Sequence, residues 1–353
     1  MNETLLRELT QADGIASRED RVRDVVVSHL RPLVDELRVD ALGNLIGLKT
    51  GTGGPRVAIA AHADEIGFVV RHIDDNGFLR IQPVGGFDPR VLCAQRVRVH
   101  RRNGDPLPGV LQPGTKPKHL LEAGEGKELR LDDLFIDVGY TGDRVRDMVE
   151  LGDMVTLRRE LEVMGDVVVS KAMDDRLGVY VMLEAIRAAG DISAEIVAVV
   201  TTQEEVGLRG ATTSAFGVEA DIAIALDVTI AGDVPGIPGD SSVTKLRGGT
   251  AIKIFDSSHL PHPHLVRHLR DIAEEQNIPH QLEVLPRGGT DAAAFQRARA
   301  GVPAGTISIP TRYVHTVNEM ASVDDIQASV DLLAAFLREA GSRSYAYEIP
   351  GEG

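Results

Sequence analysis

Hydrophobic and polar positions follow two different periods along this chain, and the period changes twice. The N-terminal region has helical spacing, in which Ser17 and Asp20 are placed like a capping box, and residues 44–50 and 56–62 then form strand-like apolar runs. From about 67 to 160 the apolar runs are short and separated by Gly, Pro and Asn turns, without a convincing amphipathic helix. This pattern predicts an α/β opening followed by a β-rich segment.

Helical and strand-like patterns alternate again after the β-rich segment. The predicted elements are a helix over 175–190, strands over 194–202 and 220–228, and helices over 265–277 and 323–341. Such alternation is typical of an α/β domain, so we expect one α/β domain that is split by a β-rich insertion. Residues 51–55, GTGGP, are interpreted as a hairpin turn.

Composition narrows the possible classes of protein. A chain of 353 residues with 43% hydrophobic content can bury one large core or two moderate ones. The net charge of -15 argues against nucleic acids and anionic membranes as partners. The chain shows no apolar leader and no membrane-spanning run, which predicts a cytoplasmic protein. The single cysteine, Cys93, excludes an internal disulfide framework and is interpreted as an ordinary core thiol.

Five candidate metal ligands stand beside turns or at the ends of apolar runs. They are His62, Asp174, Glu205, Asp227 and His315. Two imidazoles and three carboxylates are a suitable supply for two divalent cations that share one carboxylate. Glu204, which directly precedes Glu205, then remains free to act as a base on a water molecule.

Each candidate also has a structural alternative. A histidine at a strand end can be a satisfied structural residue, Asp174 and Asp175 can cap a helix, and Glu204 can be a solvated charge. Asp64 lies two positions after His62, so in an extended segment it falls on the same side and can accept the imidazole N–H. This association favours the metal-site interpretation.

A second histidine cluster offers a rival metal site. His259, His262 and His264 lie within six positions and can chelate a metal. The interleaved Pro261 and Pro263 instead predict a turn that leads into a helix, and no carboxylate accompanies the three imidazoles. The first set of candidates is therefore the better metal site.

A glycine-rich loop supplies candidate substrate contacts. The glycine pair 288–289, followed by Thr290 and Asp291, fits a loop that caps a helix over 291–300, with backbone amides facing a pocket as the functional alternative. Arg287 can attract acidic side chains or can be simply solvated. No glycine-rich phosphate-binding motif occurs in the sequence, so nucleotide chemistry is unsupported.

The motifs together resemble a known family. The segments AHADEIG, SKAMDDRLG, TTQEEVGLRGA, ALDVT, RGGTDAAAFQ and PTRYVHTVNE resemble, in order and over nearly the whole chain, the tetrahedral (TET) aminopeptidases, dinuclear metallopeptidases that include glutamyl and deblocking aminopeptidases. The resemblance implies an α/β fold with a mixed-sheet α/β/α catalytic domain over 1–66 plus 162–353. It also implies an inserted, β-barrel-like and PDZ-like dimerisation domain over 67–161.

The resemblance further implies the metal ligands. His62 and Asp227 would hold one metal, Glu205 and His315 the other, and Asp174 would bridge them. Two divalent ions per subunit are implied, with zinc as the expected ion and cobalt or manganese suited to the same nitrogen and oxygen donors.

Other residues receive roles by the same resemblance. Glu204 would be the general base and then the proton donor to the leaving amine, and Asp64 would support His62 as a second catalytic residue. Gly289, Thr290 and Asp291 would lie near the substrate. The peptide bond that follows the bridging aspartate would be cis.

The implied activity is removal of N-terminal residues from short peptides that have a free amino terminus. Dimers would assemble into a tetrahedral dodecamer, and residues 116–121, KPKHLL, resemble the loop that reaches a neighbouring subunit. The alternatives are a dinuclear deacylase or carboxypeptidase, an endoglucanase, and a non-enzymatic assembly protein. An endoglucanase would need paired acids in an aromatic-lined sugar cleft, which a chain without Trp does not suggest.

Overall fold

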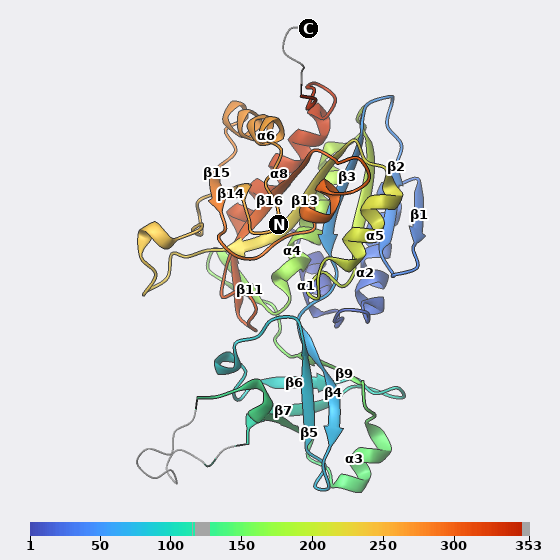
Figure 1. Ribbon diagram of the computed structural model, residues 1–353, viewed down its shortest axis with the longest axis vertical. Helices are drawn as coiled ribbons and strands as arrows, with labels where there is room; N and C mark the ends of the chain where they lie inside the picture. The colour runs from blue at the N-terminus through green and yellow to red at the C-terminus, as the bar shows by residue number, and fades with distance from the viewer. Residues whose placement is uncertain (115, 117–127, 348–353) are drawn as a thin grey trace.

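The computed structural model describes residues 1–114, 116 and 128–347. Figure 1 shows two parts along the long axis of the molecule, a larger α/β part and a smaller β part that lies below it. Only Lys116 of the predicted inter-subunit loop 116–121 is described, and the C-terminal tail 348–353 also lies outside the described residues.

One large mixed sheet forms the centre of the α/β part. Its strand order is β1-β2-β12-β3-β13-β16-β17-β11-β10, and β14 pairs with β16 and with β15. The strands are β1 (Glu36–Val39), β2 (Leu45–Lys49), β3 (Arg56–His62), β10 (Glu162–Met164), β11 (Val167–Ser170), β12 (Glu195–Thr201), β13 (Ile222–Ile230), β14 (Thr250–Phe255), β15 (His280–Val284), β16 (Ala304–Arg312) and β17 (Glu319–Ser322). The four central strands β12, β3, β13 and β16 run parallel.

The predicted hairpin at residues 51–55 is wrong. This segment joins β2 to β3, but β12 lies between these two strands and pairs with both. The glycines instead allow the backbone of this segment to pass close to the backbone at Ser193, because a Cβ on Gly51 would lie only 2.2 Å from the backbone oxygen of Ser193. The local sequence marks a turn, but the pairing depends on a strand that is more than a hundred residues away.

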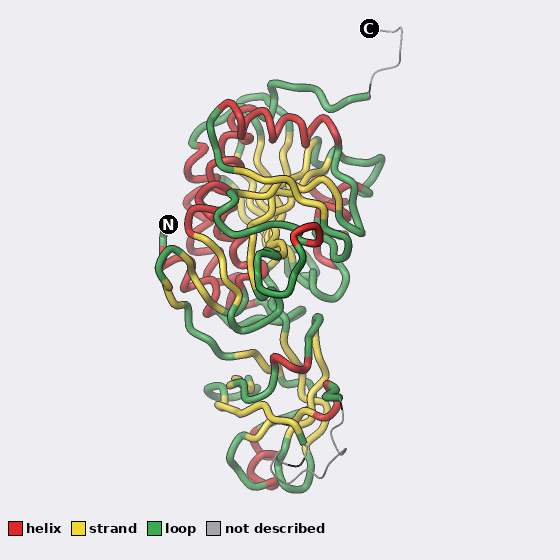
Figure 2. Tube along the Cα trace, turned by 90° about the vertical axis from the view of Figure 1, so that its left-hand side faces the viewer, coloured by secondary structure: helices red, strands yellow, loops and turns green. Residues whose placement is uncertain are grey.

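Helices cover both faces of the sheet, as the view in Figure 2 shows. Alternation along β3 explains this, because Val57, Ile59 and Ala61 belong to one apolar core while Ala58 and Ala60 belong to another. The first core is covered by α1 (Glu3–Gln11), α2 (Asp20–Leu30), α4 (Met173–Ala189), α6 (Pro263–Glu275) and α8 (Val323–Glu339). The second core is covered by α5 (Arg209–Val218) and α7 (Ala292–Gln296).

The capping box expected at the start of α2 is absent. The helix begins at Asp20, and its N-cap residue, Glu19, makes no side-chain capping hydrogen bond. Ser17 has a φ of 68°, and its N–H donates to Oε1 of Glu19 at 2.8 Å. The Glu19 carboxylate also accepts the N–H of Gln203 at 3.1 Å, so it serves a distant turn rather than its own helix.

The smaller part is a closed barrel with its own apolar core. Its strands are β4 (Gly67–Ile73), β5 (Leu79–Val84), β6 (Arg96–Val99), β7 (Leu107–Pro113), β8 (Leu134–Asp137) and β9 (Met154–Leu157), and all of their pairings are antiparallel. A mixed α/β sheet with a β-barrel was the fold class implied by the resemblance, and it is confirmed. No convincing amphipathic helix was expected in this region, and the structure has one short helix, α3 (Gly142–Met148), which is too short for its period to be visible in the sequence.

Short 3₁₀ turns complete the described structure: η1 (Arg31–Leu33), η2 (Pro89–Val91), η4 (Leu131–Asp133) and η5 (Gly239–Ser241). Within the described residues, none of the helices has the length and apolar character needed to cross a membrane.

A buried cluster of charges joins the barrel to the sheet. Oδ1 and Oδ2 of Asp13 accept from Nη1 of Arg98 in β6 at 3.2 and 3.1 Å, and Oδ1 accepts from the hydroxyl of Thr156 in β9 at 3.0 Å. Nζ of Lys171 lies 3.2 Å from Asp13 and 2.7 Å from both carboxylate oxygens of Glu65. Burial disfavours the Asp13 carboxylate, but Lys171 and Arg98 outweigh it and hold its pKa below the usual range. Paired charges therefore fix the barrel against the sheet.

Candidate metal centre and active site

The candidate residues gather where parallel strands of the sheet end. His62 is the last residue of β3 and is in register with Thr201, the last residue of β12. Asp227 lies in β13 two residues beyond Ala225, which pairs with Ala60 of β3. Because parallel strands end at the same edge of a sheet, their carboxyl ends bring these side chains together.

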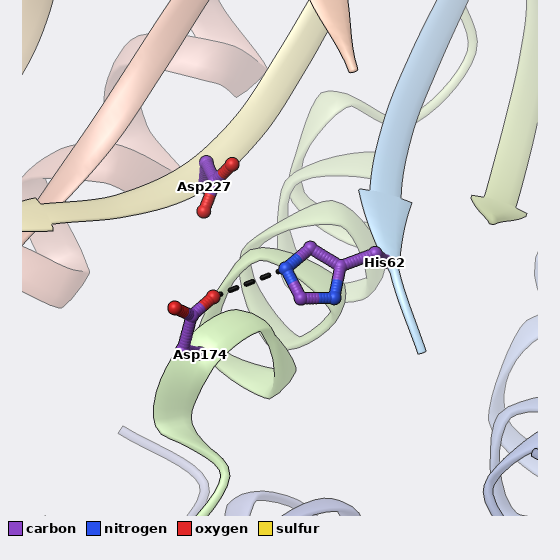
Figure 3. Close-up of side chains that lie close together, drawn as sticks. All are labelled: His62, Asp174 and Asp227. Atoms are coloured by element: carbon purple, nitrogen blue, oxygen red, sulfur yellow. Dashed lines mark hydrogen bonds and ion pairs between the residues drawn. The ribbon is translucent and has the colours of Figure 1, made fainter. Parts of the chain in front are cut away.

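Two groups of candidate ligands meet at this edge and share one aspartate. The first ligand group is His62, Asp174 and Asp227, whose ligand atoms all lie within 4.8 Å of one another (Figure 3). The second ligand group is Asp174, Glu205 and His315, within the same limit. The five residues singled out in the sequence thus lie close together in the structure.

Asp174 presents a different carboxylate oxygen to each histidine. Its Oδ1 lies 3.0 Å from Nε2 of His62, and its Oδ2 lies 3.3 Å from Nε2 of His315. Oε1 of Glu205 is also 3.3 Å from Nε2 of His315. Two atoms that each bind a tetrahedral zinc ion at about 2.0–2.1 Å are about 3.3 Å apart. The donors and their spacing therefore fit a metal ion in each group.

Glu204 lies beside the first ligand group without belonging to it. Its Oε2 is 4.0 Å from Nε2 of His62, and its side chain is 13% exposed. Burial raises the pKa of Glu204 well above its usual range, and the charge of Asp227 acts in the same direction. A carboxyl group in this place can accept and release a proton beside the candidate ligands.

Asp64 acts differently from the sequence expectation. Nδ1 of His62 lies 3.0 Å from the backbone oxygen of Asp64 but 3.6 Å from its carboxylate Oδ1. The Asp64 carboxylate instead accepts the backbone N–H of Glu204 through Oδ1 at 3.0 Å and that of Glu205 through Oδ2 at 3.2 Å. Its carbonyl orients the imidazole, and its side chain fixes the turn that carries both glutamates.

Asp175 holds the backbone of another candidate ligand. Its Oδ2 accepts the N–H of His62 at 3.2 Å, and its Oδ1 accepts the N–H of Gly178 at 3.0 Å. The Asp174–Asp175 peptide bond is cis, as the resemblance implied. Both residues have non-helical backbone angles, so the regular part of α4 begins after them.

Two further buried carboxylates were missed in the sequence. Glu319 accepts the N–H of Asp174 at 3.1 Å and that of His315 at 2.8 Å. Glu19, described above, accepts the N–H of Gln203, next to the glutamate pair. The only signal for Glu319 was an acid four positions after a histidine, which no local pattern distinguishes from a solvated charge.

The electrostatics of the site reflect crowded carboxylates. Burial disfavours a charged imidazole at His315, but hydrogen bonds with Asp174 and Glu205 outweigh it and raise its pKa to about 12. Burial raises the pKa of Asp227 well above its usual range, and the neighbouring Asp174 adds to this. A divalent cation would neutralise such a cluster, so these perturbed groups mark a candidate functional site.

A cavity of about 380 Å³ opens beside the candidate ligands. Apart from the ligands, its lining includes Ile230, Leu285, Arg287, Gly289 and Val314. The cavity therefore has an acidic end at the ligand groups and a mostly apolar end that carries one cationic side chain. Its size suits a single amino-acid side chain with the adjoining backbone.

The three predicted substrate residues are placed differently. Gly289 lines the cavity, whereas Thr290 and Asp291 are buried behind it. The hydroxyl of Thr201 donates to Oδ2 of Asp291 at 2.5 Å, and the hydroxyls of Thr290 and Thr306 lie 3.2 Å apart. Contact of Thr290 and Asp291 with substrate stays a prediction.

The rival histidine cluster forms no ligand group among the described residues. His262 is the N-cap residue of α6, and its ring lies edge-on to that of His264 with centroids 5.4 Å apart. Nε2 of His259 faces the backbone oxygen of Ala304 at 3.4 Å. These rings pack at the start of a helix, as their prolines predicted.

Adjoining histidine and carboxylate groups at the end of a parallel sheet, beside a cavity lined by glycine, apolar side chains and one arginine, are features of a metallopeptidase. The match to a family model agrees with this class. Residues 43–332 match the family described as M42 glutamyl aminopeptidase, and the chain belongs to that family. It is therefore an aminopeptidase of the M42 peptidases.

Related proteins are named as aminopeptidases or as peptidases. The lysyl aminopeptidase of Pyrococcus furiosus is 34% identical over 349 residues, which cover 95% of this chain and 96% of that protein. A solved aminopeptidase from the archaeon Desulfurococcus kamchatkensis is 41% identical, with a TM-score of 0.92 over 96% of this chain and 94% of that one. The TET1 peptidase of Pyrococcus horikoshii, which can assemble into a tetrahedron or a large octahedral shell, is 32% identical, with a TM-score of 0.85 over 96% and 99% of the two chains.

Proposed function

We propose that this aminopeptidase uses two metal ions to remove N-terminal residues from short peptides. The observation that carries the proposal is the position of Asp174, which offers one carboxylate oxygen to each ligand group. A carboxylate that contacts two histidines through different oxygens is well placed to bridge two cations.

The donor atoms indicate which residues would hold the metals. His62 and Asp227 would bind one ion, Glu205 and His315 the other, and Asp174 both. Imidazole nitrogen and carboxylate oxygen suit zinc first, and cobalt or manganese also. When bound, the ions would supply Lewis acidity to the scissile carbonyl and to the attacking water.

Glu204 would move the protons of the reaction. Its carboxylate lies within reach of the first ligand group but is not needed as a ligand. It would take a proton from the attacking water and then give it to the amine of the departing peptide. Asp64 supports this role because it accepts the backbone N–H of Glu204 and so fixes the backbone position from which the Glu204 side chain extends.

The shape and charge of the cavity favour a peptide end. A free ammonium group is attracted by the acidic ligand groups, and the side chain of the first residue can extend along Ile230, Leu285 and Val314. The backbone at Gly289 would contact the substrate, with Thr290 and Asp291 behind it. An N-blocked peptide lacks the positive charge that these acidic groups select.

The barrel would serve assembly. We infer that the segment 67–161 is a dimerisation domain inserted into a catalytic domain of residues 1–66 and 162–353, and that dimers build a tetrahedral dodecamer. The fold similarity to a peptidase that can form a tetrahedron supports this inference. Analytical ultracentrifugation would reveal the dodecamer, and a monomer of 38.0 kDa at micromolar concentration would contradict it.

A panel of blocked peptides tests the activity. Metal-stripped protein refilled with zinc, cobalt or manganese should hydrolyse free-amino peptides, including those with a blocked C-terminus, and should leave N-acetylated peptides intact. Cleavage of the N-acetylated series would indicate a deacylase, and dependence on a free C-terminus would indicate a carboxypeptidase. Full activity after metal stripping would overturn the two-metal proposal.

A further inference from the structure

One buried side chain connects two candidate ligands that lie outside the regular strands, Asp174 and His315. Glu319 is the first residue of β17 and is 2% exposed. Its Oε2 accepts the backbone N–H of Asp174 at 3.1 Å, and its Oε1 accepts that of His315 at 2.8 Å. The two oxygens of one carboxylate thus hold the backbones of two members of the second ligand group.

Stability of the fold alone does not explain why a carboxylate is buried at position 319. In the described part of the chain it pairs with no lysine or arginine, and its two hydrogen bonds are those to Asp174 and His315. Burying a carboxylate without a cationic partner is costly, and an apolar residue would fill the same space more cheaply. The carboxylate is therefore best explained by the two amides that it holds.

The backbones that Glu319 holds need external support. His315 has a φ of 63° and Tyr313 a φ of 60°, in the left-handed region that non-glycine residues rarely adopt. On the other side, Ala172 has a φ of 55° two residues before Asp174. Neither ligand lies in a regular strand, so strand pairing cannot fix either one.

The first ligand group is supported differently. His62 lies in β3 and Asp227 in β13, where strand pairing already fixes their backbones. A change at Glu319 would therefore act fully on His315, partly on the shared Asp174, and hardly on the other two. This asymmetry distinguishes Glu319 from a residue that stabilises the whole site.

We propose that Glu319 is a positioning residue that fixes the second ligand group through the backbone N–H groups of Asp174 and His315. The proposal rests on the two-metal function proposed above. Breaking the two hydrogen bonds of Glu319 should therefore weaken metal binding mainly at the second ligand group. Mutation of residues that support metal ligands typically lowers metal affinity by about 10- to 100-fold.

Two substitutions separate the hydrogen bonds from the charge. Glu319→Gln keeps the shape but removes the charge and turns one acceptor into a donor that faces an N–H. Glu319→Asp keeps the charge but is one methylene shorter and cannot reach both amides. The matched control is Asp325→Asn, because Asp325 likewise accepts two backbone N–H groups, from Arg247 and Gly249 at 2.7 and 2.8 Å, away from the site.

The experiment is a titration of the metal-free full-length protein with Co²⁺ alone, followed by calorimetry and by the visible absorption of bound cobalt. The wild type should bind two ions per chain. Both Glu319 variants should bind one ion at least tenfold more weakly and the other with a much smaller loss of affinity, because Asp174 is shared, and lost peptidase activity should return at high Co²⁺. Asp325→Asn should lower the thermal midpoint and leave both affinities unchanged.

The outcomes separate the two proposals. If the wild type binds fewer than two ions, the two-metal function fails and this proposal fails with it. If the wild type binds two and Glu319→Asp also binds two with unchanged affinities, the positioning role alone is overturned, since charge rather than hydrogen bonding then explains any effect of Glu319→Gln. Circular dichroism verifies folding, and if Glu319→Gln does not fold, Glu319→Asp decides.

Discussion

Oε2 of Glu204 lies 4.0 Å from Nε2 of His62, close enough to share a bound water but outside both ligand groups. Its neighbour in the sequence, Glu205, belongs to the second group and faces the other histidine. Two adjacent glutamates therefore have separate positions, because neighbouring side chains diverge from the turn that Asp64 fixes.

Glu204→Gln should retain metal and lose turnover. The amide keeps the size of the side chain but cannot accept a proton from water, so we expect kcat to fall by about 10²- to 10⁴-fold. Metal content per chain, measured by elemental analysis, should match the wild type, whereas Glu205→Gln should lose metal as well as activity. A Glu204→Gln enzyme with near wild-type kcat would remove the base assignment.

Arg287 should bias the enzyme against basic substrates. It lines the cavity and forms no ion pair among the described residues, so its charge is available to a substrate side chain in that cavity. Arg287→Glu should lower the ratio of kcat/KM for glutamyl over lysyl p-nitroanilide by about tenfold or more, an effect that salt weakens. Arg299→Glu, on the surface beside Glu219, is the control. An unchanged ratio would mean that Arg287 is simply solvated.

Breaking the charge cluster at the junction should destabilise the fold. Asp13→Asn removes the negative partner of Arg98 and weakens the pairing of Lys171, which are both held at the barrel interface. Removing one partner from a buried ion pair costs about 3 kcal/mol in free energy of unfolding. The control is Asp88→Asn, which breaks an exposed pair with Arg90 and should cost under about 1 kcal/mol. Urea unfolding at fixed protein concentration measures both, and equal costs would contradict the prediction.

His100 should make stability fall in mild acid. Burial lowers its pKa to about 4, and Arg21 donates to Nδ1 at 3.1 Å, which requires a neutral imidazole acceptor. The imidazole of His100 is protonated near pH 6.5 in the unfolded chain but only near pH 4 in the folded chain. The contribution of neutral His100 to the free energy of unfolding is therefore fully present above pH 6.5 and is lost as the pH falls toward 4.

The size of this effect is at most about 3 kcal/mol in free energy of unfolding. Urea midpoints of the wild type and of His100→Gln, measured across this range, isolate it from the carboxylates, which titrate in both proteins. The difference between the two proteins should shrink or reverse toward acid pH. A difference that is independent of pH would show that His100 does not titrate in this way.

The sequence and the structure agree most closely where one strand or one motif is enough. The runs that became β3, β12 and β13 were long and apolar, and they placed His62 correctly at the end of its strand. Asp227 was also expected at a strand end, but β13 continues beyond it to Ile230. The barrel could be predicted as β-rich because short alternating runs and turn residues recur across it. Such elements can be predicted from the local sequence because they do not depend on which distant segments pack against them.

The remaining features depend on distant partners. The turn at 51–55 was mistaken for a hairpin because β12, which separates its two strands, is encoded far away. Glu19 was passed over because its carboxylate holds Gln203 rather than its own helix, and Glu319 because its partners include Asp174. Backbone hydrogen bonds to acidic side chains leave no mark in a sequence.

The central position of β3 also has a consequence for how the chain is made. β3 pairs with β12 and β13, which are synthesised long after it, whereas the strands of the barrel follow one another directly between Gly67 and Leu157. During synthesis the barrel can therefore close first, while the apolar residues 57–61 of β3 still lack their pairing strands β12 and β13. The barrel would thus be folded before the sheet that carries the candidate ligands, so the site is the last part of the protein to be completed.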